Sequence, residues 1–175
     1  MAKTQVFPGR FTAQIDGPFV VFRLGIRVNR FFSFWKWLPT LRALLPVLNT
    51  LLRTTAPGHL ESFSISYLSA GRGIVQYWRS LDDLEEFAQS DDSPFHELWR
   101  RYYRSPGVDG SVGLWYEAFL VEANRYESVY DNMPVAGLAV ASHHLPAVGR
   151  RETARRRLGG EGEPGLPSPA NPAPR

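Results

Sequence analysis

The stretch that decides the fold is Ile74–Val121, IVQYWRSLDDLEEFAQSDDSPFHELWRRYYRSPGVDGSVGLWYEAFLV. Its apolar and polar residues predict a strand, a helix, a short break, a second helix and a strand. The preceding stretch, residues 19–68, predicts a strand, a helix and a strand. Two such halves in one small domain are the outline of a ferredoxin-like fold. We therefore predict an α+β protein with the order βαββαβ, in which both helices cover one face of a four-stranded antiparallel sheet.

The composition is that of a folded domain with a tail. The 175 residues are 43% hydrophobic and 13% aromatic, which is enough for a sizeable core. There is no cysteine, so the chain has neither disulfides nor thiolate metal sites. The first residues lack the apolar run of a secretory signal, and the apolar segment 31–52 is interrupted by charges and prolines. We expect a cytoplasmic protein with no membrane span.

Charge and composition divide the chain into three expected parts. These are an N-terminal arm over 1–16, a folded domain over 17–148 with a C-terminal extension from 122, and a disordered tail over 149–175 that is basic and then Pro/Gly-rich. Six Arg and three Glu in 150–175 account for the whole formal net charge of +3. The folded part is therefore neutral overall, and we expect no nucleic-acid partner. The Arg-rich run 150–157 is interpreted as a solvated helix or extension, with docking to an anionic partner as the alternative.

Turn and cap signals set the expected element boundaries. The first helix is predicted over 41–53, with a kink or break at Pro46. Ser80 is expected to open the second helix, and Pro94 to begin a third that ends at Tyr103. Glycines at 71 and 73 indicate a hairpin turn over 70–73. The expected strands are 19–28, 59–68, 74–79 and 111–121.

The first strand has two different faces. Val20, Phe22 and Leu24 share a face that suits packing beneath helices, and Arg23 and Arg27 lie on the other. The helix-free sheet face is expected to carry Arg23, Arg27, Gln76 and Trp78. Large apolar side chains on such a face gain free energy when they are buried. We therefore expect two copies to pack sheet to sheet as a homodimer, which creates a pocket in each subunit.

His96 is the candidate catalytic base. It lies in the helix that begins at Pro94 and shares a helical face with Trp99 and Tyr103. An imidazole exchanges protons near neutral pH and also ligates haem iron. Both roles stay open, beside the alternative of a surface histidine packed against Trp99.

Two polar residues end the first strand and are candidates for holding negative charge. Arg27 and Asn29 offer guanidinium and amide groups, which stabilise a substrate oxyanion in a dry pocket. The alternative is that they only satisfy backbone groups at the strand end. Arg23 lies nearer the strand centre, where a buried guanidinium requires a partner, and Glu117 is the candidate.

Aromatic residues form the remaining candidate pocket. Trp78, Trp99 and Tyr116 suit a flat, hydrophobic ligand, although such residues also form cores and dimer interfaces. Tyr130 follows the last strand as part of a lid or of plain packing. Adjacent histidines on a strand point to opposite faces, so His143 and His144 predict no metal site.

Several separated blocks resemble a family of small monooxygenase-like proteins, most of them uncharacterised. The blocks are GRFTAQIDGPFVVFRLGIRVNR (9–30), KWLP (36–39), VQYWRSLDDLEEFA (75–88), SPFHELWRRYYR (93–104), GSVGLWYE (110–117) and YESVYDNMP (126–134). The resemblance covers about residues 9–158. The family includes a fungal member from fumagillin-type biosynthesis and belongs to the antibiotic-biosynthesis-monooxygenase superfamily of dimeric α+β barrels.

The resemblance implies a cofactor-independent monooxygenase of secondary metabolism that acts on a hydrophobic aromatic or polyketide-like small molecule. For such a reaction, the residues themselves make His96 the candidate base, with Arg27 and Asn29 as candidates for stabilising the oxyanion. The implied substrate-binding residues are Arg23, Gln76, Trp78, Trp99, Tyr103, Tyr116 and Tyr130. The family often reads close to IWHETY where this chain has LWYEAF, so Tyr116 takes the place of a histidine. A haem-binding protein of the same fold, with His96 as axial ligand, and a non-catalytic ligand-binding or scaffolding dimer remain the alternatives.

Overall fold

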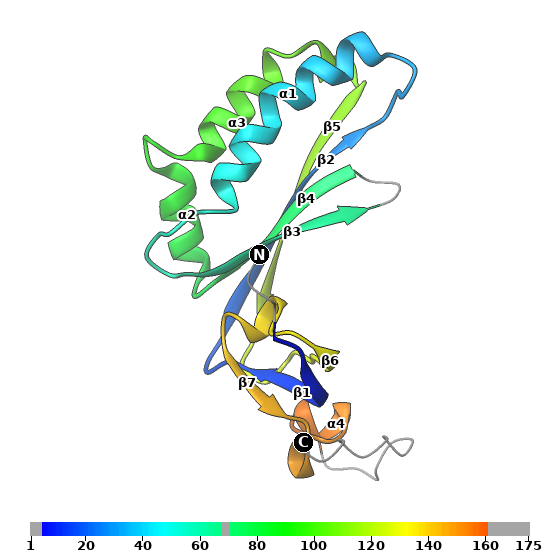
Figure 1. Ribbon diagram of the computed structural model, residues 1–175. Helices are drawn as coiled ribbons and strands as arrows, with labels where there is room; N and C mark the ends of the chain where they lie inside the picture. Colours follow the sequence, from blue (N-terminus) through cyan, green and yellow to red (C-terminus); the bar gives the residue numbers. More distant parts are fainter. Residues whose placement is uncertain (1–4, 68–70, 161–175) are drawn as a thin grey trace. The chain divides into compact units, whose positions relative to one another are not determined.

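The computed structural model describes residues 5–67 and 71–160. The described residues form two units (Figure 1), one over Val20–Leu120 and the other over residues 5–19 and 121–160. Ala70 of the expected hairpin turn and the expected disordered tail beyond residue 160 lie outside the described residues. None of the described helices is long and apolar enough to cross a membrane.

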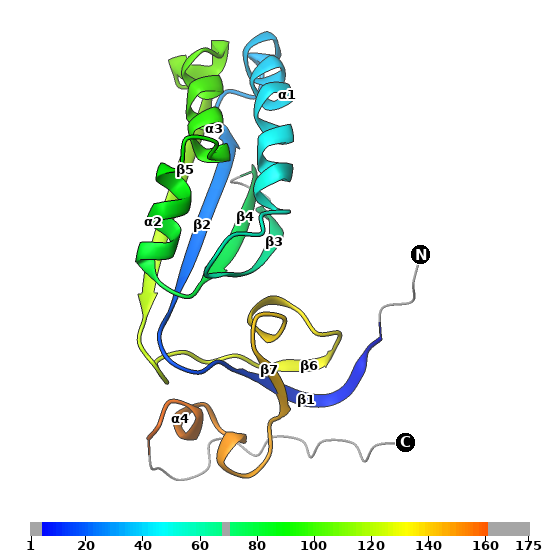
Figure 2. The ribbon, with the colours of Figure 1, turned by 90° about the vertical axis from the view of Figure 1, so that its left-hand side faces the viewer.

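The central unit has the predicted order of strands and helices. Its elements are β2 (Phe19–Val28), α1 (Phe34–Leu51), β3 (His59–Tyr67), β4 (Gly71–Trp78), α2 (Leu81–Gln89), α3 (Pro94–Tyr103) and β5 (Val112–Val121). The sheet order is β3-β4-β2-β5, and β4 is antiparallel to both β2 and β3. The three helices lie on one side of the sheet (Figures 1 and 2). This arrangement confirms the ferredoxin-like fold.

The alternation of β2 orients this sheet as predicted. Val20, Phe22, Leu24 and Ile26 are buried in the core cluster, together with residues of the helices. Their neighbours along the strand point to the face that carries no helix. Burying each of these large apolar side chains contributes about 1.5–3 kcal/mol, which fixes the face that β2 presents to the helices.

The expected positions of Gln76 and Trp78 on the helix-free face are wrong. In the antiparallel register Trp78 is opposite Val20, and Gln76 is opposite Phe22. Directly opposed residues share a face of the sheet, so both side chains point toward the helices. Both side chains are 0% exposed. They belong to the interior of the protomer rather than to its open sheet face.

The sequence predicts a kink or a break at Pro46, and of these the break is wrong, because α1 is a single helix that contains Pro39 and Pro46. A proline inside a helix costs about 3 kcal/mol through its lost hydrogen bond and its steric clash. Leu44, Leu48 and Leu51 of α1 are buried in the core, and their burial outweighs this cost. Arg101 of α3 also donates to the Ala43 carbonyl just before Pro46, at 3.0 Å.

The structure confirms the starts that the sequence predicts for α2 and α3. Ser80 caps α2, and its hydroxyl accepts a hydrogen bond from the Asp83 backbone N–H at 3.1 Å. Ser93 caps α3 in the same way, and Pro94 occupies the first turn, where its missing N–H costs nothing. Phe95 and Leu98 then bury one side of α3, which leaves the opposite side open to solvent.

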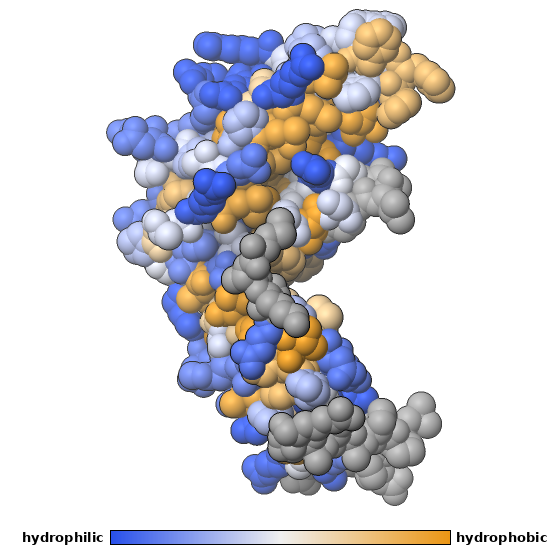
Figure 3. Space-filling view, in the orientation of Figure 1, coloured by the Kyte–Doolittle hydropathy of each residue, from blue (hydrophilic) through white to orange (hydrophobic). Residues whose placement is uncertain are grey.

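An exposed aromatic segment spans the connection between β2 and α1 and the first turn of α1. Phe31, Phe32, Phe34 and Trp35 are all exposed, and Phe32 is 90% exposed. Figure 3 shows apolar surface at the upper right, over the connection between β2 and α1. This surface is separate from the sheet face, so it offers a control position for experiments on that face.

The second unit is built around a small sheet in the order β6-β1-β7. Its elements are β1 (Phe7–Gln14), β6 (Tyr130–Met133), β7 (His143–Pro146), α4 (Ala154–Arg157) and three-residue 3-10 helices at Gly137–Ala139 and Gly149–Arg151. β1 pairs antiparallel with both short strands. The expected N-terminal arm over 1–16 therefore contains a strand, and its partners lie more than a hundred residues later in the chain.

Candidate functional site

A mostly apolar cavity of about 430 Å³ lies between α2, α3 and the strands β2 and β5. Its lining residues are Phe22, Leu24, Leu81, Leu84, Glu85, Ala88, Phe95, His96, Trp99, Tyr116 and Ala118. Sites for small molecules have volumes of roughly 300–1,000 Å³ and are lined by apolar and aromatic groups with a few polar ones. The size and lining of this cavity fit a small hydrophobic molecule.

His96 reaches this cavity because the packing of α3 fixes its orientation. Phe95 and Leu98 are buried against the core, while His96 and Trp99 lie at the edge of that buried side and line the cavity. The His96 side chain is exposed at the rim. It is therefore accessible both to a ligand in the cavity and to water, as a group that exchanges protons must be.

Tyr116 lines the same cavity from the sheet. Along β5, Val112 lies in the helix-covered core, and the period of two turns Tyr116 toward the same side. The Tyr116 ring centroid lies 6.0 Å from that of Phe22 and 6.4 Å from that of Trp99, which it meets edge to face. With 61% of its surface exposed, Tyr116 presents its hydroxyl as a hydrogen-bonding group to the cavity or to solvent.

Of the other predicted aromatic residues, Trp99 lines the cavity and Tyr103 does not. The Tyr103 ring stacks on Trp99 with the centroids 5.7 Å apart. Tyr103 therefore supports Trp99 from the outer side, toward solvent. The helical spacing of four residues had placed these two side chains together, and the structure confirms that placement.

Arg27 and Asn29 do not lie with His96. Arg27 is exposed and follows Arg23 on the helix-free side of β2. The Asn29 side chain donates to the Gly110 carbonyl at 3.2 Å, and its backbone N–H donates to the Ser111 carbonyl at 2.9 Å. Asn29 thereby connects the end of β2 to the start of β5. Neither residue lines the apolar cavity within this protomer.

Gln76 and Trp78 form a buried hydrogen-bonded pair. Trp78 Nε1 donates to Gln76 Oε1 at 3.3 Å, and Gln76 Nε2 donates to the Leu51 carbonyl at 2.9 Å. Trp78 also packs against Phe87 of α2, with ring centroids 5.2 Å apart. These contacts connect β4 to α1 and α2, and they leave neither side chain in the cavity lining.

Arg23 and Tyr130, the two remaining predicted site residues, do not line the apolar cavity either. Arg23 pairs with Glu117 at 3.1 Å, which confirms the predicted partner. Tyr130 belongs to the second unit, where its hydroxyl accepts a hydrogen bond from the Ala139 N–H at 3.3 Å and its ring meets His144 edge to face. Burial raises the pKa of Tyr130.

The α2 side of the cavity was not among the predicted site residues. Leu81, Leu84 and Ala88 all line the cavity, as does Glu85 at its rim. The spacing of three and four residues was a visible signal, because it places these side chains on one helical face. Glu85 is the only charged group in the described lining, so the cavity favours neutral or cationic ligands over anions.

Metal-binding side chains do not gather in the described part of the chain, where no three His, Cys, Asp or Glu residues form a group that could hold a metal ion. His143 is exposed, whereas His144 stacks on Phe11 with ring centroids 4.4 Å apart. Burial lowers the pKa of His144. The two histidines thus face different surroundings, as expected for neighbours on a strand.

The fold and the cavity define a class of protein: a ferredoxin-like α+β domain with an apolar pocket between its helices and its sheet. The family described as Monooxygenase af470-like matches residues 19–138, which is more than half of the chain. The chain therefore belongs to this monooxygenase-like family. No curated protein matches it.

Solved structures resemble the chain in fold. An aldoxime dehydratase in complex with butyraldoxime matches with a TM-score of 0.58 and 16% identity, over 81% of this chain and 44% of that one. The chain thus spans less than half of the dehydratase. A dimeric protein of unknown function and ferredoxin-like fold from Bacteroides fragilis matches with a TM-score of 0.37 and 8% identity, over 59% of this chain and 96% of that one.

Proposed function

We propose that this protein is a cofactor-independent monooxygenase that acts on a small hydrophobic molecule, either aromatic or polyketide-like. One observation carries the proposal: His96 and Tyr116 line a single, mostly apolar cavity of about 430 Å³. Membership of the monooxygenase-like family supports the same reaction class. The substrate site is this cavity, and Phe22 and Trp99 provide its aromatic walls.

In the proposed reaction, His96 removes an acidic proton from an activated CH₂ or phenol group of the substrate. The resulting carbanion or phenolate gives electrons to O₂, and a C–O bond forms to a hydroperoxide. The hydroperoxide O–O bond then breaks with loss of water, which leaves a carbonyl where the CH₂ stood. The overall change is CH₂ plus O₂ to C=O plus H₂O. For a phenol, the ring C–H and the O–H together supply the two hydrogens, and the product is a quinone plus H₂O. In both cases the substrate supplies every electron and no external reductant is needed.

Tyr116 takes the role of oxyanion donor in this proposal. Its hydroxyl hydrogen can be directed at the oxygen on which the negative charge of the deprotonated substrate is delocalised. Such a hydrogen bond stabilises charge more strongly in an apolar site than in water. Arg27 and Asn29 are not included in this step, because they lie outside the cavity.

The proposal is tested by oxygen uptake with a panel of electron-rich phenols, hydroquinones and cyclic β-diketones. His96→Gln is expected to slow uptake about 10²–10⁴-fold, which is the usual contribution of a general base. His143→Gln is the matched control, because this exposed histidine lies in the second unit. Absence of uptake across the whole panel, or equal rates in both variants, would overturn the proposal.

Haem is the alternative occupant of the same cavity. His96 could ligate its iron, but the described lining offers no Arg or Lys to pair with the haem carboxylates, and it contains the acidic side chain of Glu85. The donor set therefore fits a neutral apolar molecule better than haem. Titration with haem is expected to give no Soret shift that depends on His96, and a shift that His96→Gln abolishes would favour haem instead.

A scaffolding dimer without a ligand site is less favoured by the packing. That alternative expects Trp78 and Tyr116 to fill the interior against each other. Trp78 instead packs on Phe87 in the core, and Tyr116 lines a cavity. These contacts favour a ligand site over a filled interior. The proposal also includes the homodimer, with a ligand pocket in each subunit.

A further inference from the structure

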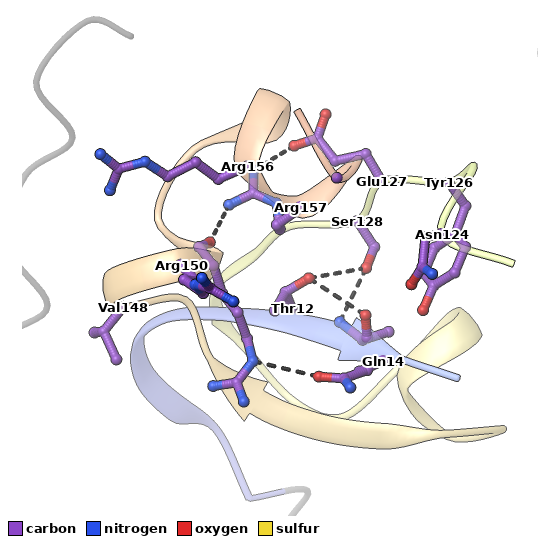
Figure 4. Close-up of a pocket in the computed structure, with 13 residues that line it drawn as sticks. Thr12, Gln14, Asn124, Tyr126, Glu127, Ser128, Val148, Arg150, Arg156 and Arg157 are labelled. Atoms are coloured by element: carbon purple, nitrogen blue, oxygen red, sulfur yellow. Dashed lines mark hydrogen bonds and ion pairs between the residues drawn. The ribbon is translucent and has the colours of Figure 1, made fainter. Parts of the chain in front are cut away.

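A second cavity, of about 520 Å³, lies in the unit formed by residues 5–19 and 121–160. It is enclosed by the end of β1, the segment 124–128 and the basic segment 148–159. Figure 4 shows arginine side chains on one side of this cavity and Asn124 and Tyr126 on the other. Three chain segments that are distant in the sequence thus build a single polar site.

The lining of this cavity is strongly basic. Its described residues include four guanidiniums, those of Arg150, Arg151, Arg156 and Arg157, and a single carboxylate, that of Glu127. Glu127 forms an ion pair with Arg157. Within the described residues, no carboxylate pairs with Arg150, Arg151 or Arg156. The cavity therefore retains an excess of positive charge.

Arg157 is the most informative member of this group. Its side chain is only 9% exposed, and its two terminal nitrogens donate to the Arg151 carbonyl and to Glu127. Its Nε atom is buried and has no hydrogen-bond partner. A buried N–H without an acceptor costs about 1–3 kcal/mol.

The opposite wall offers neutral hydrogen-bond donors. The Ser128 hydroxyl oxygen accepts a hydrogen bond from the Ala13 N–H at 2.9 Å, and a hydroxyl group can donate as well as accept. Thr12 lies beside it, with the two hydroxyl oxygens 3.4 Å apart. The site thus combines cations on one side with hydroxyl groups on the other.

We propose that this cavity binds a small polar molecule through an oxyanion, either a phosphate or a carboxylate group. Arginine forks match both groups in geometry and charge, and charge-assisted hydrogen bonds are about twice as strong as neutral ones. Arg150 and Arg156, which are exposed, hold the anionic oxygens together with Arg151, and Ser128 contacts the neutral part of the ligand. This inference does not depend on the proposed monooxygenase activity.

The test uses the full-length protein with ¹⁵N-labelled arginine. Inorganic phosphate and succinate are titrated separately, with sodium chloride at matched ionic strength as the reference. The Arg157 Nε–H signal is expected to shift and saturate with one or both anions, and to stay in place with chloride. The anion that binds more tightly identifies the class of oxyanion.

Two variants separate a built site from general attraction to a basic segment. Arg156→Gln is expected to weaken binding about tenfold, because it removes a charge-assisted contact. Arg155→Gln is the control, because it removes the same charge from the same helix while Arg155 does not line the cavity. Only screened charge is lost in this variant, so its affinity for the anion should fall by less than about twofold. Equal weakening in both variants, or an Arg157 signal that neither anion moves, would overturn the proposal.

Discussion

Arg23 and Glu117 form an ion pair across β2 and β5, with 3.1 Å between the guanidinium and the carboxylate. The pair lies on the face of the sheet that carries no helix, and the Arg23 guanidinium lies 5.6 Å from the centre of the Trp115 ring. Both partners are still partly exposed in the single chain. The sheet face therefore combines aromatic surface with a paired charge, and aromatic residues are enriched at protein interfaces.

The first prediction is that the chain forms a homodimer through this face. Phe63 on β3 packs beside Tyr77, with ring centroids 6.0 Å apart, so Phe63→Asp places a charge in the interface. Analytical ultracentrifugation is expected to show a dimer for the wild type and a monomer for Phe63→Asp. Phe32→Asp is the control, because Phe32 is just as apolar and lies outside the sheet. A monomeric wild type at micromolar concentration would contradict the prediction.

The second prediction concerns Gly25, which lies beneath Trp115. A Cβ atom at position 25 would lie 2.5 Å from the Trp115 ring, closer than any real contact. Gly25→Ala is expected to lower the free energy of unfolding by about 1–3 kcal/mol, because the ring must move. Urea denaturation measures this change. In a Trp115→Leu background, Gly25→Ala should lower the free energy of unfolding by less than it does in the wild type. An equal loss in both backgrounds would show that the Trp115 ring does not cause the destabilisation.

The third prediction separates a structural role of Gln76 from a ligand-binding one. Gln76→Leu leaves the Trp78 N–H without its acceptor and removes one of two donors to the Leu51 carbonyl, which keeps the Thr54 backbone N–H at 3.3 Å. The expected loss is about 1–3 kcal/mol in the free energy of unfolding, since both groups are buried. Gln89→Leu, an identical change at the exposed end of α2, should shift stability by less than about 0.5 kcal/mol. Equal effects in urea denaturation would contradict the buried pair.

The fourth prediction is a loss of stability as the pH falls below neutrality. Burial lowers the pKa of His59, and the neighbouring charge of Glu61 opposes this shift only in part. The unfolded imidazole binds its proton near its ordinary pKa of about 6.5, so the contribution of His59 is complete above that pH and is lost as the pH falls toward the lower folded value.

Denaturation midpoints at about pH 7.5 and about pH 5.5 measure this dependence. His59→Gln is expected to reduce it, and His143→Gln to leave it unchanged. Burial also lowers the pKa of His144, so some dependence should remain. Arginine partners lower the pKa of Glu97, and Lys36 lowers that of Asp109, so these carboxylates lose their contributions only at more acidic pH. A larger loss of stability between these two pH values in His59→Gln than in the wild type would show that His59 affects stability in the opposite direction.

The sequence predicted those elements whose signals are local. The alternation of Val20, Phe22 and Leu24 correctly gave the buried face of β2, and the serines at 80 and 93 correctly gave the starts of α2 and α3. In each case the deciding residues are neighbours along the chain, so caps and periodicity are sufficient evidence.

Features that depend on distant pairing were not predictable in the same way. The face of Gln76 and Trp78 follows from their register with β2, which becomes visible only once β4 is paired. β1 is a strand because β6 and β7, each four residues long, pair with it from the far end of the chain. The helix through Pro46 persists because tertiary burial outweighs a local penalty.

The candidate site was predictable from α3 and β5 but not from α2. His96 and Trp99 were found through their helical spacing, and Tyr116 through its aromatic side chain and the family pattern. Leu84 and Glu85 complete the cavity only because α2 packs beside α3 in three dimensions. The predicted oxyanion role of Arg27 and Asn29 requires polar groups at the strand end to face the cavity. Arg27 instead lies on the helix-free face, and Asn29 lies at the end of β2.

The measurement that tests the central claim most directly is isotope incorporation from ¹⁸O₂. A substrate that supports oxygen uptake is incubated with the protein under labelled oxygen, and the product is examined by mass spectrometry. The account predicts a product that carries one labelled oxygen atom, formed by the wild type and by His143→Gln but not at a comparable rate by His96→Gln. A product without label, or labelled product formed equally well by His96→Gln, would contradict the assignment of the apolar cavity as an oxygenase site.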